Sequence, residues 1–140
     1  MGFHYLQVAY ESMVTWQNEI DLLRCNKSFF GHPRFDYVIV ATETDLFYAQ
    51  LLRLFQFQAK PHTYSLALVK VYGWPPGGLR RKDKDFGLHR VRLKSDPYQI
   101  IAISSIVRGV VLVEDPSIIG DYFVVDTIDG DIFLRLGNYL

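Results

Sequence analysis

Apolar side chains in the first 25 residues recur at helical spacing. Ala9, Met13, Trp16, Ile20 and Leu23 follow one another at steps of four, three, four and three residues, with mostly polar residues between them. This recurrence is typical of the apolar face of an α-helix, so the sequence predicts a helical segment over residues 1–25. Such a face packs either on a sheet of the same chain or on a partner helix.

Residues 24–35 contain Gly and Pro and are predicted to be irregular, and the pattern changes beyond them. Residues 37–41 are β-branched, and residues 47–57 alternate with period two except at 52–54, which predicts a strand with a bend or bulge. Residues 60–63 are predicted to turn, and a bulge or corner is expected at Arg108-Gly109. Further strands are predicted at 64–72, 88–93, 98–104 and 106–113.

The final part of the chain has the pattern of a β-hairpin. Residues 122–128 and 131–136 flank Asp129-Gly130, a pair typical of a type I′ turn. A two-residue turn there would place Asp126 diagonally opposite Arg135, as a candidate ion pair.

Together these patterns predict a mainly β fold, with seven or eight short strands and one N-terminal helix. The strands predict a small antiparallel β-barrel or curled sheet whose core spans residues 35–136. The whole chain, residues 1–140, is expected to form a single domain.

The composition agrees with a compact domain of 140 residues, because 49% of the residues are hydrophobic and the net charge is zero. This composition excludes an intrinsically disordered chain and a protein that coats nucleic acid through bulk charge. With one cysteine, Cys25, no intramolecular disulfide can form. No secretory signal is evident, and no apolar run approaches the roughly 18 residues that span a bilayer. The expected protein is intracellular, without a membrane partner.

The zero net charge conceals a segregation along the chain. Residues 71–95 hold seven basic and two acidic side chains, whereas residues 96–140 hold two basic and seven acidic ones. The sequence leaves open whether the two stretches neutralise each other in the folded domain or the basic one is available to a partner.

Few residues carry a pattern typical of catalysis. The four histidines are scattered, and the carboxylates near Asp129 lack the remaining ligands of a calcium loop. Gly77-Gly78 lacks the spacing and the Lys-Ser/Thr ending of a phosphate-binding loop. The sequence leaves open whether two carboxylates that are distant along the chain meet in the fold as an acid–base pair. We therefore expect a non-enzymatic protein with no metal, no cofactor and no small-molecule substrate.

The segment from Tyr72 to Lys94 interleaves aromatic and basic residues. Cations bind phosphates through counterion release, and exposed rings offer stacking platforms for bases or for methylated lysine. The alternative is a solvated charged loop that covers one end of the barrel. The first interpretation predicts a module that binds nucleic acid or chromatin through Trp74, Arg80, Arg81, Lys82, Lys84, Arg90 and Arg92.

A second hypothesis is a protein–protein or self-association module, which would form a homodimer. Here the contact would be made by the helical face of Met13, Trp16, Ile20 and Leu23, or by the two oppositely charged stretches.

Six stretches of the chain carry a recognisable pattern. They are residues 23–36, Phe47-x-Ala49-Gln50-Leu51, residues 66–69, Gly87-Leu88-x-Arg90-x-Arg92, residues 105–109 and residues 124–135. Over about residues 23–136, this pattern resembles one found in transposon-associated proteins of mushroom-forming fungi, from elements of the Kyakuja–Dileera–Zisupton type. The resemblance implies an accessory domain on the C-terminal side of a larger, mobile-element-derived protein, a nuclear location and no catalytic residues.

The chain departs from this pattern at two positions. Lys27 stands where Pro is usual, and Gln50 stands where Arg is common, so a site built on that arginine would be missing. The strand pattern and the Arg-rich insertion are also similar to a bromo-adjacent homology (BAH) domain, a β-barrel that binds histones or other chromatin proteins.

Overall fold

The computed structural model describes residues 2–3, 5–29, 32–43, 46–73 and 88–125. These residues form a mainly β structure, in which a short 3₁₀ turn (Ile103–Ser105) separates two of the strands. The strands are β1 (Gly2–Phe3), β2 (Tyr5–Glu11), β3 (Asn18–Phe29), β4 (His32–Phe35), β5 (Tyr37–Ala41), β6 (Leu46–Ala59), β7 (His62–Gly73), β8 (His89–Ala102), β9 (Ile106–Glu114) and β10 (Asp121–Val125).

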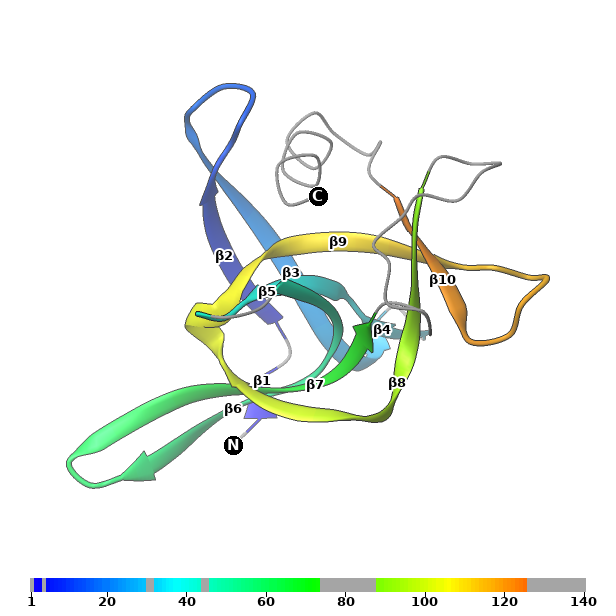
Figure 1. The fold of residues 1–140 in the computed structure, drawn as a ribbon. Coiled ribbons are helices and arrows are strands. Elements are labelled where there is room, and N and C mark those ends of the chain that lie inside the picture. Colours follow the sequence, from blue (N-terminus) through cyan, green and yellow to red (C-terminus); the bar gives the residue numbers. More distant parts are fainter. Residues whose placement is uncertain (1, 4, 30–31, 44–45, 74–87, 126–140) are drawn as a thin grey trace.

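Six antiparallel strands close on themselves as a barrel (Figure 1). The order is β6-β5-β9-β10-β8-β7, and pairing of β7 with β6 completes the ring. The short β1 adds to β6, while β2, β3 and β4 form a separate three-stranded sheet. The prediction of a small antiparallel β-barrel is therefore confirmed.

The predicted helix over residues 1–25 is wrong for the described residues, because they form β1, β2 and the first part of β3. β2 and β3 pair antiparallel as a hairpin in which Ala9 lies opposite Ile20. Residues 24–29 and 32–35, predicted to be irregular, also belong to strands, since β3 continues to Phe29 and pairs with β4. The helical spacing gave a wrong prediction, because the apolar residues that it groups together lie on both faces of this hairpin.

The turn between β2 and β3 forms without Gly or Pro. The buried Ser12 holds it, because its carbonyl accepts a hydrogen bond from the Trp16 amide and its hydroxyl accepts one from the Val14 amide. Trp16 takes the left-handed conformation, with φ of 58°, and its ring is exposed. A bulky residue rarely adopts this conformation, so the turn gives no conventional sequence pattern.

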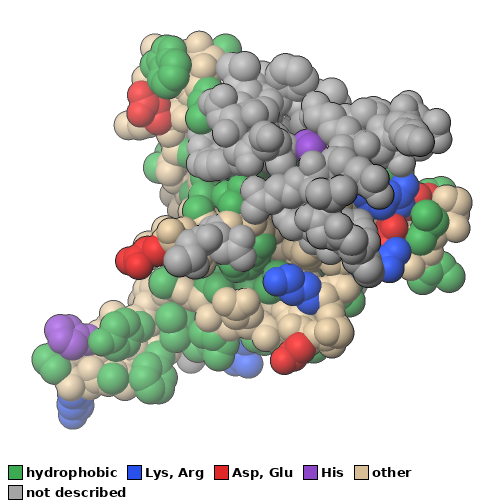
Figure 2. Space-filling view, in the orientation of Figure 1, with side chains coloured by type: hydrophobic (Ala, Val, Ile, Leu, Met, Phe, Trp, Pro, Cys, Tyr) green, Lys and Arg blue, Asp and Glu red, His purple; other side chains and the backbone are tan. Residues whose placement is uncertain are grey.

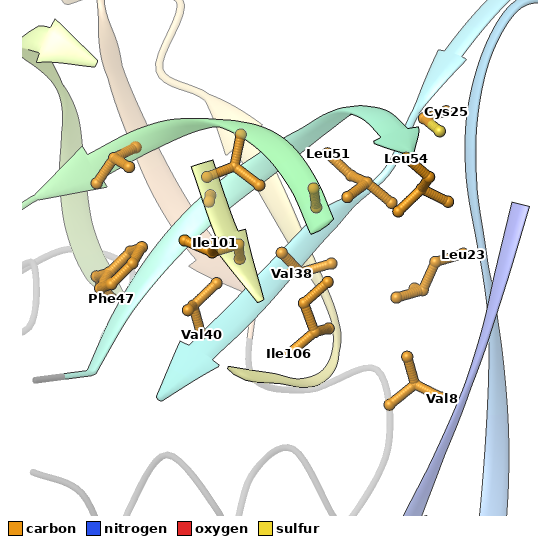
Figure 3. Packing of buried hydrophobic residues seen from close by; sticks show 14 residues of the cluster. Val8, Leu23, Cys25, Val38, Val40, Phe47, Leu51, Leu54, Ile101 and Ile106 are labelled. Atoms are coloured by element: carbon orange, nitrogen blue, oxygen red, sulfur yellow. The ribbon is translucent and has the colours of Figure 1, made fainter. Parts of the chain in front are cut away.

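The larger of two hydrophobic clusters joins this hairpin to the barrel (Figure 3). Val8 and Leu23 come from the hairpin, and they share this cluster with residues of β5, β6, β7, β8 and β9. Alternate residues of β5 belong to different clusters, so this strand is buried on both faces. The cluster is completed by Cys25, Val38, Val40, Phe47, Ala49, Leu51, Leu54, Ala67, Val69, Val71, Ile101 and Ile106.

Polar contacts fix the hairpin on β9. The Asp21 carboxylate accepts a hydrogen bond from the Gly109 amide at 2.8 Å and pairs with the buried Arg108 guanidinium at 3.2 Å. Gly109 permits this close approach, because a Cβ there would lie 2.8 Å from a methyl carbon of Leu23. The guanidinium of Arg108 also stacks over the Tyr10 ring, 4.3 Å from its centroid. The register of β9 against β5 shifts at Val107, one residue before the Arg108-Gly109 pair where the bulge or corner is expected.

The predicted strand over residues 47–57 is confirmed, together with its bulge. Leu51 pairs with Val69 and Arg53 pairs with Leu68, so Leu52 is an extra residue on β6. The strands predicted at 88–93 and 98–104 are one strand, β8, whose pairing with β7 is interrupted between Leu93 and Tyr98. The predicted hairpin at Asp129-Gly130, with Asp126 and Arg135, lies outside the described residues.

Truncating two residues of the apolar pattern in residues 9–23 tests the observed hairpin against the predicted helix. Leu23 is 3% exposed and Ile20 is 64% exposed. Leu23→Ala should lower the free energy of unfolding by about 2–5 kcal/mol, because it leaves a cavity in the core. Ile20→Ala should change it by less than about 1 kcal/mol. Urea unfolding of both variants measures the difference, and equal losses would contradict the hairpin.

Candidate nucleic-acid interface

Most of the basic loop predicted from the sequence lies outside the described residues. This applies to Trp74, Arg80, Arg81, Lys82 and Lys84, which belong to the segment between β7 and β8. Arg90 and Arg92 are described, on β8.

Arg90 and Arg92 are both paired with acidic residues from the turn between β9 and β10 and its flank. Arg90 donates to Asp115 at 2.8 Å and to Asp121 at 3.1 Å, and Arg92 donates to the other oxygen of Asp121. Both carboxylates are buried, and the Arg90 guanidinium also stacks on the Phe123 ring at 4.6 Å. In this part of the molecule the acidic stretch of the sequence neutralises the basic one.

The pKa of the Asp115 carboxyl shows how strongly its charged form is favoured. The Ser117 hydroxyl donates to it at 2.6 Å and the Ser117 amide at 2.9 Å. The Ser117 hydroxyl contributes most, followed by Arg90, and together these donors lower the pKa of Asp115 from 3.8 to about 2. Hydrogen bonding to Asp121 likewise raises the pKa of Arg92 above its usual range. The network fixes the β9–β10 turn against β8.

The four residues of the predicted self-association face do not share a surface. Trp16 and Ile20 are exposed, Met13 is half-buried in the turn, and Leu23 is buried in the core. The structure therefore offers no helical stripe for a partner, although self-association by another surface stays a prediction.

A face that the sequence did not single out lies on β6, β7 and β8. We call it the outer face, and it consists of residues that alternate with the buried Leu54, Ala67, Val69 and Ile101. Residues paired across the strands share a face, so the register defines its rows. These rows are Phe57–Tyr64, Phe55–Leu66–Ala102, Arg53–Leu68–Ile100 and Lys70–Tyr98.

Aromatic and aliphatic side chains on this face are open to solvent. Phe57 is 55% exposed, Tyr64 47% and Tyr98 61%, and Ile100 is exposed to a similar extent. The first two lie on the end of the β6–β7 hairpin that projects from the barrel (Figure 1), where residues 56–65 are all exposed. Figure 2 shows hydrophobic side chains along this hairpin. Exposed apolar side chains gathered in this way mark an interaction surface.

The cations near the outer face differ from Arg90 and Arg92. Arg53 and Lys70 lie on the face, Lys60 lies in the hairpin turn, and Lys94 lies on β8. Within the described part of the chain, none of these four takes part in an ion pair. β6, β7 and β8 together contain one carboxylate, Asp96. Among the described residues, this part of the surface therefore combines exposed rings with positive charge that has no ion-pair partner.

A hollow lies in the outer face, between its second and third rows. Its volume is about 390 Å³, which falls in the range of small-ligand sites. The outer-face residues of its lining are Phe55, Arg53, Leu68 and Ile100, which supply one ring, one guanidinium and two aliphatic side chains. Gln56 also lines the hollow, from a position on β6 that alternates with Phe55.

The thiol of Cys25 and the phenols of Tyr37 and Tyr72 are buried or partly buried. Burial raises the pKa of the Cys25 thiol, which keeps it protonated and unreactive. Burial also raises the pKa values of Tyr37 and Tyr72, whose rings stack edge-on with 5.8 Å between centroids. Among the described residues, no group of three His, Cys, Asp or Glu side chains could hold a metal ion. In the same part of the chain, no helix is long and apolar enough to cross a membrane.

Comparisons with protein-family models, with curated proteins and with solved structures each found no match to this chain. The resemblance to transposon-associated fungal proteins and to BAH domains therefore stays a prediction.

The Asp115 network should make stability depend on pH in the acid range. Between about pH 4 and pH 2 the unfolded carboxyl binds a proton that the folded one does not. The free energy of unfolding should therefore fall as the pH drops through this window. Asp115→Asn should remove this component, and Ser117→Ala should narrow the window, because Arg90 still pairs with the carboxylate. Urea unfolding across this pH range measures both. An unchanged pH slope in Asp115→Asn would contradict the proposed role of the network.

Proposed function

We propose that this protein is a non-enzymatic module that binds nucleic acid through the outer face. The observation that carries the proposal is the charge on and beside this face, where Arg53, Lys60, Lys70 and Lys94 have no ion-pair partner among the described residues. A polyanion supplies the missing partners, and release of its counterions drives the association.

The charge also favours nucleic acid over a second copy of the chain. A symmetric dimer through this face would bring Arg53 and Lys70 against the same residues of the other copy, with no carboxylate except Asp96 on these strands. Like charges placed together across an interface oppose binding. Phosphates avoid this repulsion.

The position of the basic loop in the chain supports its inclusion in the proposed binding site. Its residues Trp74, Arg80, Arg81, Lys82 and Lys84 join β7 to β8, two of the three strands that carry the outer face. We therefore retain them as candidate phosphate and base contacts. Arg90 and Arg92 are assigned instead to holding Asp115 and Asp121. A chromatin protein as partner, a mobile-element origin and a nuclear location stay predictions from the sequence.

Removing cations from the outer face should make nucleic-acid binding less dependent on salt concentration. For a labelled single strand of about 15 nucleotides, log Kd should vary linearly with log salt between about 50 and 200 mM. The triple variant Arg53→Gln/Lys60→Gln/Lys70→Gln should reduce the steepness of this line by up to about 2, since each phosphate contact contributes about 0.7. Arg80→Ala/Arg81→Ala/Lys82→Ala tests the loop in the same way. Fluorescence anisotropy measures both.

Arg34→Gln is the matched control, because Arg34 is already paired with Asp36 at 3.1 Å. It should leave the slope unchanged. Absence of binding to any nucleic acid at the lowest salt, or an equal slope in wild type and triple variant, would refute the proposal.

A further inference from the structure

The outer face carries rings at both of its ends and cations in the half nearer Tyr98. Tyr64 lies opposite Phe57 at one end, and Lys70 lies opposite Tyr98 at the other. These ends are six residues apart on β7, which corresponds to about 20 Å along an extended strand. Arg53 lies between them, in the row of Leu68 and Ile100. An extended chain that carries both flat rings and anions would meet complementary groups along the face.

The hollow between these ends has the chemistry to hold a flat heterocycle. Phe55 offers a ring on which a base can stack, while Leu68 and Ile100 form an apolar lining. Arg53 offers hydrogen-bond donors to the edge of the same base.

From these two features we infer that the ligand of the outer face is a single-stranded nucleic acid, one of whose bases enters the hollow beside Arg53 and Phe55. This inference rests on the proposed function and specifies its ligand. The other rings, Phe57, Tyr64 and Tyr98, stack on neighbouring bases, and the cations contact the phosphates.

A duplex cannot use the same features. Its bases are stacked on one another and paired, so neither the exposed rings nor the hollow reaches a base face without unstacking. A duplex would therefore contact only the cations, and its binding would depend on charge alone. Stacking on exposed rings is also tolerant of sequence, because every base has a flat π-face. We expect weak preference among the four bases.

The inference is tested with three labelled ligands that share the same length and differ in their bases. They are a mixed-sequence single strand of about 15 nucleotides, its duplex, and an abasic strand that keeps the phosphates. At the same salt concentration, the single strand should bind at least about tenfold more tightly than either of the others, since one stacked base contributes about 1–3 kcal/mol. Anionic phospholipid vesicles are measured alongside, because exposed rings beside lysines also suit a membrane surface.

Variants of the outer face locate the effect. Ile100→Trp should fill the hollow and abolish most of the preference for the base-bearing strand, whereas Ile119→Trp is the matched control at a position that is 93% exposed and outside the face. Phe57→Leu and Tyr64→Leu should each weaken single-strand binding by about tenfold, with binding to the abasic strand unchanged. Trp16→Leu, at another exposed ring, should have no effect. All these side chains are exposed, so the variants should fold.

The possible outcomes separate this inference from the proposed function. Equal affinity for the base-bearing, abasic and duplex ligands would overturn the single-strand inference and leave nucleic-acid binding by charge intact. An unchanged preference in Ile100→Trp would overturn the assignment of the hollow. Binding to vesicles but to none of the nucleic acids would overturn both.

Discussion

A single extra residue in β6 decides which side chains the barrel presents to solvent. Phe47, Ala49 and Leu51 face the core, and a regular strand would continue this face with residues 53, 55 and 57. The bulge at Leu52 shifts the alternation by one, so that Leu54 takes the next core position. A one-residue shift moves every later side chain to the opposite face. The arginine and the two aromatic rings beyond the bulge are therefore on the surface, and the candidate interface depends on this register.

The closed ring of strands also determines which cations are neutralised. β10 lies between β8 and β9, so Asp121 meets Arg92 directly across the ladder and Asp115 reaches Arg90 from the adjoining turn. On the other side β8 meets β7, whose one charged residue is Lys70, and Asp96 is the one carboxylate that these two strands contain. Pairing between distant strands thus divides the basic residues into a compensated and an uncompensated group. The linear charge pattern indicated the segregation but could not assign single residues to either group.

The barrel was predictable from the sequence because its strands carry period-two or β-branched patterns with turns between them. The N-terminal hairpin was not, since Ala9 and Ile20 lie opposite each other in its register while Leu23 faces the core, a division that helical spacing concealed. Its turn depends on Ser12 and a left-handed Trp16 rather than on Gly or Asn. For the candidate interface, the sequence contains the aromatic residues. The face of the sheet on which Phe55 and Phe57 lie depends on the bulge at Leu52.

Buried ion pairs and exposed cations of this barrel respond differently to salt. The carboxylate of Asp121 is 2% exposed, and pairs in such positions are screened only weakly by salt. Arg53 and Lys60 are exposed, so their attraction for a polyanion decreases as the salt concentration rises. A moderate rise in salt should therefore weaken phosphate contacts while the Arg90–Asp115–Asp121–Arg92 network keeps the β9–β10 turn in place. Under the proposed function, Arg90 and Arg92 stabilise the fold and the cations of the outer face bind the ligand. The two groups do not compete, because Asp115 and Asp121 supply the counter-charges of the first and phosphates supply those of the second.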